Sequence, residues 1–197
     1  MPPKATKRRQ QAAKTRAKLS STALGLIEKR GIENVKIQDI ATAAGVSVGV
    51  FYHYFPSKQH VIFDLYREAD EIFRNDVAPK LDAASAADRI LQFFRFYAEF
   101  NASQGLKITR VLYNPRNKWF IDRSRYMITL LCGVIQSGQD AGEITCDLTA
   151  QDLCDRLFII ARGTVYDWCL HEGTYDLADY MTDMFRRIVP VFCAPGR

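Results

Sequence analysis

The stretch AGVSVGVFYHYFPSK, residues 44–58, decides the fold, because it places a short helix between two breaks in the chain. Gly45 can adopt the left-handed conformation that ends a helix, and Ser47 can cap the start of the next one. Apolar residues at helical spacing indicate another short helix over 37–44. The pattern therefore predicts two short helices joined by a tight turn, with Pro56 ending the second.

Helical periodicity continues on both sides of this pair. Apolar residues recur three and four positions apart, and sustained alternation of the kind found in strands is absent. The sequence therefore predicts an all-α fold of about nine helices. They are expected from residue 19 to about 30, at 37–44, 47–54 and 57–78, and near 86–103, 106–113, 117–140, 150–172 and 176–192.

Positive charge is concentrated at the beginning of the chain. The formal net charge is +5, and residues 1–18 contain no Asp or Glu. We therefore expect three parts: a basic N-terminal arm over 1–18, a helix-turn-helix domain over 19–60 and a larger domain over 61–197. The seven basic residues of the arm are Lys4, Lys7, Arg8, Arg9, Lys14, Arg16 and Lys18. Such an arm would add salt-sensitive affinity for DNA, although it can equally be a solvated tail.

Two short helices joined by a glycine-containing turn have the geometry of a DNA-binding helix-turn-helix. In that geometry the second helix enters the major groove, and the small residues at its beginning would allow a close approach to the base edges. The same corner also occurs in helical proteins that do not bind DNA. Phe51 and Phe55 are predicted to be core residues.

A more specific signal comes from the pattern A-G-V-S-x-G-x-x-Y-x-Y-F-x-S-K, which runs from Ala44 to Lys58. It resembles the DNA-binding signature of the tetracycline-repressor (TetR/AcrR) family, and the resemblance covers about residues 10–80. The resemblance implies contacts with bases or the adjacent backbone from Ser47, Val48, Gly49, Val50 and Tyr52. It also implies phosphate contacts from Tyr52, His53, Tyr54 and Lys58.

The sequence departs from the family pattern at two places. Where the family commonly has Ser or Thr at the opening of the first short helix, this chain has Val35 and Lys36. An Asn34 cap or a phosphate contact from Lys36 is therefore expected instead. The second departure is Val50, where family members often have a hydroxyl-bearing residue or alanine. The side chains of Val48 and Val50 cannot form hydrogen bonds, so base recognition would depend on thymine methyl groups and DNA shape.

Aromatic residues are frequent between residues 90 and 131, as in the wall of a small-molecule pocket. Most such rings are ordinary core residues, and an arginine on a helix is more often part of a surface ion pair. The resemblance implies an effector cavity among the helices at 86–140, with contributions from the helices at 57–78 and 150–172. The expected effector-binding residues are Phe94, Tyr97, Tyr113, Trp119, Arg123 and Tyr126.

The last two helices suggest a second copy of the chain. The helix at 150–172 is apolar nearly all round, and the helix at 176–192 has one apolar stripe with charged residues beside it. The resemblance implies a homodimer through these helices. A two-fold dimer would bind a pseudo-palindromic double-stranded DNA operator. A small-molecule effector would then release the DNA, although activation by ligand occurs in similar systems.

Signatures of enzymes are absent from the sequence, including the H-E-x-x-H, G-x-S-x-G, Walker and G-x-G-x-x-G motifs. With three histidines and five scattered cysteines, no enzyme activity, cofactor or metal site is expected. The chain has no secretion signal or membrane-spanning run, so a cytoplasmic regulator is expected. The alternative is a helical small-molecule-binding protein whose helix-turn-helix has lost DNA binding.

Overall fold

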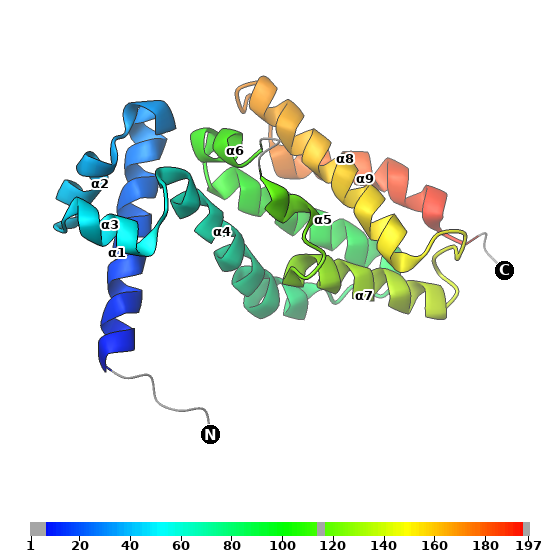
Figure 1. Cartoon of the computed structure of the whole chain (residues 1–197). Coiled ribbons are helices and arrows are strands. Elements are labelled where there is room, and N and C mark those ends of the chain that lie inside the picture. Colours follow the sequence, from blue (N-terminus) through cyan, green and yellow to red (C-terminus); the bar gives the residue numbers. More distant parts are fainter. Residues whose placement is uncertain (1–6, 114–116, 195–197) are drawn as a thin grey trace. The chain divides into compact units, whose positions relative to one another are not determined.

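The computed structural model describes residues 7–113 and 117–194, and these residues form helices joined by short loops (Figure 1). They contain no β-strand, so the all-α fold class is confirmed. The chain divides into two compact units, Met1–Tyr66 and Arg67–Arg197, and the boundary lies within helix α4 (Lys58–Ile72). No described helix is long and apolar enough to cross a membrane.

The first unit contains the predicted helix pair. Gly45 ends the first of the two helices with a positive φ of 70°, a conformation that glycine adopts without steric cost. Ser47 caps the second, since its Oγ accepts a hydrogen bond from the Val50 backbone N–H at 3.2 Å. Both expected turn features are therefore confirmed. The elements of this unit before α4 are α1 (Lys7–Arg30), the 3₁₀ turn η1 (Ile32–Asn34), α2 (Ile37–Ala44) and α3 (Val48–Tyr54).

The start of α2 is stabilised by a carboxylate instead of the expected Asn34 cap. The backbone N–H of Lys36 donates to Asp39 Oδ2 at 2.9 Å. Asn34 instead donates from Nδ2 to the carbonyl oxygen of Arg30 at 2.8 Å and so satisfies the end of α1. The Asn34 cap was therefore a wrong prediction, and the side chain of Lys36 remains exposed.

Helix α1 begins at Lys7, so much of the region expected to be a basic arm is helical; residues 1–6 lie outside the described part. Arg16 belongs to the folded unit. Its Nε and Nη2 atoms donate to the two carboxylate oxygens of Asp64, each at 2.8 Å, and its guanidinium lies 4.7 Å from the centre of the Phe55 ring. Phe55 and Phe51 are fully buried, which confirms them as core residues. Arg16 therefore stabilises this unit, and the expected DNA-binding role of residues 1–18 stays a prediction.

The second unit is a helical bundle in which α5 packs against α7 and α9, and α7 packs against α8. Figure 1 shows α8 and α9 side by side. Hydroxyl or carboxylate caps at Ser85, Thr149 and Asp176 begin α5, α8 and α9. After α4 the elements are η2 (Phe73–Val77), η3 (Ala78–Lys80), α5 (Ala86–Ser103), α6 (Leu106–Leu112), η4 (Lys118–Ile121), α7 (Tyr126–Asp140), α8 (Ala150–Leu170), α9 (Leu177–Ile188) and η5 (Val189–Phe192).

Aromatic rings form the centre of the second unit. Phe94 stacks on Phe185 with ring centroids 3.9 Å apart. Phe158 and Tyr97 meet Phe94 edge-on, at centroid distances of 5.8 and 6.2 Å. Because each buried ring removes a large apolar surface from water, this cluster is a major source of the unit's stability.

The expected continuous helix over 117–140 is wrong. The side chain of Asn117 accepts a hydrogen bond from the backbone N–H two residues later, at 3.2 Å. Asp122 Oδ1 accepts bonds from the backbone N–H and the hydroxyl of Ser124, at 2.9 and 2.6 Å. These local bonds compete with helical ones, so the chain turns and α7 begins only at Tyr126.

Candidate DNA-binding face and effector cavity

Helix α3 presents a solvent-exposed face made of residues expected to contact DNA. Val50 is 36% exposed and Tyr52 is 54% exposed, while Gly49 and His53 are also exposed. Val48 lies half-buried at the beginning of the helix. On the opposite side Phe51 is fully buried, which fixes the orientation of this face.

Glycine at position 49 is not required by the packing of the unit itself. A Cβ atom built there would meet only the Ser47 Oγ, at 3.7 Å, which is an ordinary van der Waals distance. The small size of Gly49 therefore leaves room at the N-terminal end of α3 for an external surface. A DNA major groove is such a surface, because it admits a helix only where the side chains allow close approach.

The remaining expected DNA contacts lie around this face. His53 packs its ring edge-on against Tyr54, with centroids 5.0 Å apart, and the Tyr54 side chain is half-buried. Lys36 is exposed at the start of α2. Lys18 of α1 is exposed near the turn, with its Nζ 3.9 Å from the position of a Cβ built at Gly45. Positive charge therefore lies beside the glycine turn.

Lys58 has an internal role in addition to the phosphate contact that its motif position implies. Its ammonium donates to the carbonyl oxygens of Ile32 and Val35, the latter at 2.9 Å. The side chain is half-buried and holds the segment between α1 and α2 against the start of α4. Because two of its three N–H groups are used internally, Lys58 stabilises the fold, and one N–H group remains for the expected phosphate contact.

Of the six residues expected to bind an effector, Phe94 contacts Tyr97 and Tyr97 contacts Tyr113, while the other three lie elsewhere in the second unit. Phe94 is part of the aromatic core, and Trp119 is 37% exposed on η4. The guanidinium of Arg74 lies over the ring of Tyr126, 4.3 Å from the ring centre. The two hydroxyls of Tyr97 and Tyr113 are 2.6 Å apart.

The Tyr97 hydroxyl belongs to a buried polar cluster. Tyr113 donates from its hydroxyl to Asn101 Oδ1 at 2.9 Å. Asn101 donates in turn from Nδ2 to the Tyr97 carbonyl oxygen at 2.7 Å. Burial raises the pKa of Tyr97, and the hydrogen bond with Tyr113 offsets part of that rise. The cluster therefore stays neutral at physiological pH and fixes the junction between α5 and α6.

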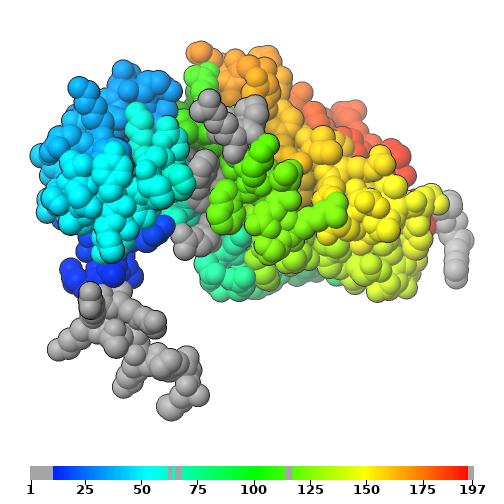
Figure 2. Space-filling view, viewed as in Figure 1, coloured from blue at the N-terminus to red at the C-terminus, as the bar shows by residue number. Residues whose placement is uncertain are grey.

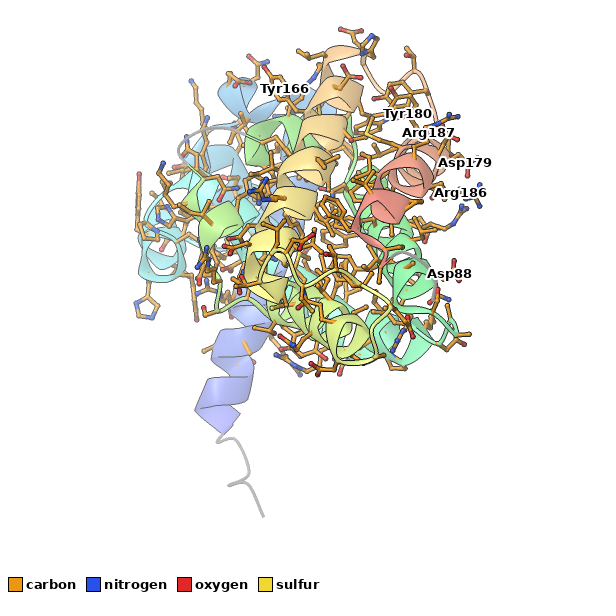
Figure 3. The ribbon with its side chains drawn as sticks, turned by 90° about the vertical axis from the view of Figure 1, so that its right-hand side faces the viewer. Asp88, Tyr166, Asp179, Tyr180, Arg186 and Arg187 are labelled. Carbon is orange, nitrogen blue, oxygen red and sulfur yellow. The ribbon has the colours of Figure 1, made fainter. Side chains whose placement is uncertain are left out.

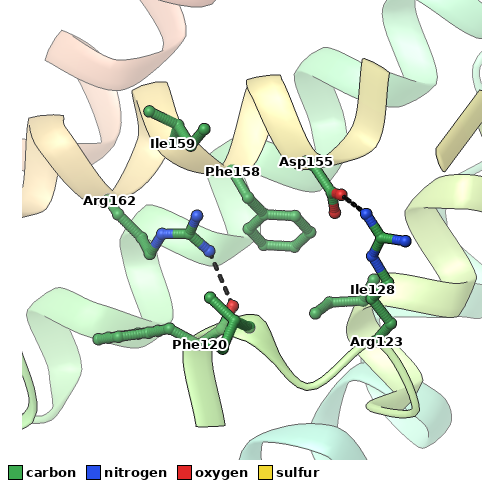
Figure 4. Close-up of a pocket in the computed structure, with 8 residues that line it drawn as sticks. Phe120, Arg123, Ile128, Asp155, Phe158, Ile159 and Arg162 are labelled. Atoms are coloured by element: carbon green, nitrogen blue, oxygen red, sulfur yellow. Dashed lines mark hydrogen bonds and ion pairs between the residues drawn. The ribbon is translucent and has the colours of Figure 1, made fainter. Parts of the chain in front are cut away.

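A cavity of about 370 Å³ lies between η4, the beginning of α7 and the middle of α8 (Figure 4). In the space-filling view the η4 segment and α8 form adjoining parts of the surface (Figure 2). Of the six expected effector residues, Arg123 lines this cavity. The full lining is Phe120, Ile121, Arg123, Ile128, Asp155, Phe158, Ile159 and Arg162.

The beginning of α7 links this cavity to α4. Arg123 lies at the cavity and forms an ion pair with Asp155, at 2.5 Å. Two residues later, Arg125 is 3% exposed in its side chain and pairs with Asp70 of α4, at 3.2 Å. Asp70 also accepts the backbone N–H of Met127, at 3.2 Å. The short segment that contains Arg123 and Arg125 therefore both lines the cavity and binds the end of α4.

The outer face of α8 carries large apolar side chains at helical spacing. Ile159, Tyr166 and Leu170 are 62%, 53% and 61% exposed. Gly163 lies on the same face, and a Cβ built there would meet nothing within 4 Å. On α9, Tyr180 is 46% exposed. Figure 3 shows Tyr166 and Tyr180 on α8 and α9 and the charged side chains that extend from α9.

Comparison with known proteins identifies the first unit. Residues 19–65 match the family described as bacterial regulatory proteins, tetR family. The repressor KstR2 of Rhodococcus jostii is 25% identical over 146 residues, which are 69% of this chain and 71% of the relative. The regulator EthR of Mycobacterium tuberculosis is 27% identical over 159 residues, 74% of this chain and 71% of the relative. Residues 19–65 therefore form a DNA-binding domain of the tetR type, and the chain is similar to transcriptional regulators over about 70% of its length.

The fold of the whole regulator agrees with this assignment. The crystal structure of FadR from Bacillus subtilis, described as a complex with stearoyl-CoA, matches 88% of this chain and 96% of its own chain. Its TM-score is 0.71 at 19% sequence identity. The likeness therefore extends from the helix-turn-helix through the second unit.

Sequence reasoning expected the helix at 150–172 to contribute to an effector cavity but named none of the residues that it supplies. Phe158, Asp155 and Arg162 come from the helix that was expected mainly to form a dimer. A usable signal was present, because Asp155 and Arg162 interrupt the apolar stretch from residue 153 to 170 and a charge on an inner face needs a partner.

Proposed function

We propose that the regulator is a homodimer that binds a pseudo-palindromic operator through α3 and is released from it by a small molecule. The observation that carries this proposal is the exposed face of α3, where the packing of the unit does not require the glycine at position 49. In a helix-turn-helix, that end of the second helix contacts the base edges.

Recognition would combine apolar and polar contacts. Val48 and Val50 would offer methyl groups to thymine, and Tyr52 and His53, from the middle of the helix, would contact the DNA backbone. Lys36 would contact a phosphate beside the start of α2, and Ser47 retains a hydroxyl proton to donate. With these contacts, we expect the operator sequence to be recognised through DNA shape and thymine methyl groups, and not through bidentate hydrogen bonds to bases.

Dimerisation is supported by the outer face of α8 and α9. Exposed Ile159, Tyr166 and Leu170 form a stripe that a monomer would leave in water. Gly163 in the middle of that stripe allows a second helix to approach closely. A symmetric contact through this face would bury the apolar stripe of each copy against the other.

The effector response would pass through the beginning of α7. A ligand in the cavity would contact Arg123 and so bias the position of the segment that also carries Arg125. Since Arg125 is paired with Asp70, the same movement would act on α4, which continues into the first unit. If the ligand binds the released conformation more tightly than the DNA-binding one, it lowers the population of the DNA-binding conformation.

The test is selection of bound duplexes from a random-sequence DNA pool by the purified protein at physiological salt. An enriched inverted repeat with half-sites about one helical turn apart, or a multiple of that, supports the proposal. Failure to enrich any sequence, with the protein folded and dimeric, favours the alternative of a small-molecule-binding protein with an inactive helix-turn-helix.

A further inference from the structure

The cavity beside α8 combines an apolar wall with an unequal set of charges. Five of its lining side chains are apolar: Phe120, Ile121, Ile128, Phe158 and Ile159. Its charged side chains are two arginines and one aspartate, Arg123, Arg162 and Asp155. The cavity therefore has one more positive than negative group.

Asp155 already has partners for both carboxylate oxygens. Arg123 donates from Nη2 to Oδ2 at 2.5 Å, and Gln151 donates from Nε2 to Oδ1 at 3.0 Å. Figure 4 shows the Asp155–Arg123 pair on one side of the cavity. These two charges neutralise each other, so the excess positive charge belongs to Arg162.

Arg162 lies on the other side of the cavity, with its guanidinium beside Phe120 and Phe158 (Figure 4). It donates one hydrogen bond, from Nη1 to the Phe120 carbonyl oxygen at 2.9 Å. Within residues 7–113 and 117–194, no carboxylate lies at ion-pair distance from it. A half-buried guanidinium has five N–H donors, and most of these lack a protein partner here.

We propose that this cavity binds a compact carboxylate ligand with an apolar body, and that Arg162 holds the carboxylate. The inference deepens the proposed function and rests on it, because it names the chemical class of the effector. The planar guanidinium fork matches the two oxygens of a carboxylate. The rings of Phe120 and Phe158 then cover the apolar body.

Size and charge both restrict the ligand. A volume of about 370 Å³ lies near the lower end of the range found for ligand pockets, roughly 300–1,000 Å³, so it suits a small aromatic or cyclic aliphatic acid. A single unneutralised arginine suits one negative charge, whereas a polyanion would need further cations. A neutral analogue of the same shape would leave Arg162 without an anionic partner and so bind more weakly.

The experiment measures binding to the full-length protein by titration calorimetry, with 3-phenylpropanoate as the probe and its neutral amide, 3-phenylpropanamide, as the paired ligand. Arg162→Gln removes the charge and should weaken binding of the carboxylate by about tenfold or more. It should leave binding of the amide unchanged. Asp155→Asn removes the competing negative charge and should tighten carboxylate binding several-fold.

The matched control is Arg89→Gln. Arg89 is also half-buried, donates to a backbone carbonyl, that of Ser85, and does not line the cavity. Its substitution should leave the affinity for 3-phenylpropanoate unchanged. The opposite effects expected for Asp155→Asn and Arg162→Gln cannot both arise from simple loss of structure.

Equal affinity of the wild-type protein for the carboxylate and the amide would overturn the proposal, as would an unchanged carboxylate affinity in Arg162→Gln. Either result can occur in a protein that still selects an inverted DNA repeat, and then the regulator function stands without this ligand class. Conversely, Arg162-dependent binding in a protein that selects no DNA would support the ligand site and contradict the proposed function.

Discussion

Lys58 is half-buried at the start of α4, where two backbone carbonyl oxygens accept its hydrogen bonds. Replacing it with methionine keeps the apolar stem and removes the charged donor. We expect Lys58→Met to lower the stability of the first unit by about 2 kcal/mol, because the carbonyl of Val35 loses the Lys58 donor and that of Ile32 keeps only the Val35 N–H. Hydrogen exchange of the peptide that contains η1 and α2 measures this directly.

Lys36 provides the control for Lys58. Its side chain is exposed at the start of α2, so Lys36→Met should change the stability by less than about 0.5 kcal/mol. The DNA affinity of the Lys36→Met protein should fall and become less dependent on salt, since one phosphate contact is lost. Unchanged hydrogen exchange in Lys58→Met would show that the internal hydrogen bonds of Lys58 contribute nothing to stability.

Gly49 differs from Lys58 because the packing of the first unit does not require a glycine at this position. We expect Gly49→Leu to fold as stably as the wild type and to lose DNA affinity by about tenfold or more, because a large side chain would block the approach of α3 to the bases. Gly25→Leu is the control, as a Cβ at Gly25 in α1 meets nothing within 4 Å. Equal operator binding by both variants, measured by fluorescence anisotropy, would place the DNA contact elsewhere.

At the scale of elements, the helix pair α2–α3 could be predicted because its determinants are local. Gly45 and Ser47 act on their immediate neighbours, and the apolar spacing shows which side is buried. The turns that replace the first part of the expected helix over 117–140 also have local causes, since Asn117 and Asp122 cap them. The prediction gave more weight to the helical periodicity of this stretch than to these two capping residues.

Other contacts had no local signal. Arg16 pairs with Asp64, 48 positions away, and only the packing of α1 against α4 brings them together. The basic composition of the N-terminus therefore suggested a DNA-binding arm for a residue that folds inward. Most of the cavity's lining residues were not predicted for the same reason, because α7 and α8 contribute Ile128 and Phe158 from distant parts of the sequence.

The attachment of α7 to α4 depends on the ion pair between Asp70 and Arg125. Because Arg125 is 3% exposed in its side chain, Asp70→Asn removes the carboxylate that pairs with a buried charge. We expect Asp70→Asn to destabilise the second unit by about 3 kcal/mol. Asp64→Asn on the same helix should cost less, about 1 kcal/mol, since its partner Arg16 is 37% exposed. Thermal unfolding of the two variants tests this ranking, and an equal or reversed order would contradict it.

At the scale of the whole molecule, a single α3 helix can read only a short half-site. Two copies joined through α8 and α9 would bind both half-sites of an operator at once, and the second contact would gain from a high effective concentration. The apolar stripe on α8 thus matters for DNA affinity although it lies in the other unit. Dimerisation and operator recognition are therefore expected to fail together when this stripe is changed.

Leu170→Glu tests that dependence, because it would place an unpaired charge in the proposed interface, on a residue that is 61% exposed in the single chain. We expect a monomer in analytical ultracentrifugation and a fall in affinity for a two-half-site duplex of about a hundredfold or more. Affinity for a duplex with one half-site should be unchanged, since the first unit is intact. Ser137→Glu, on an exposed position of α7, should remain dimeric. A dimer that persists in Leu170→Glu with full operator affinity would exclude the α8 stripe as the contact between copies.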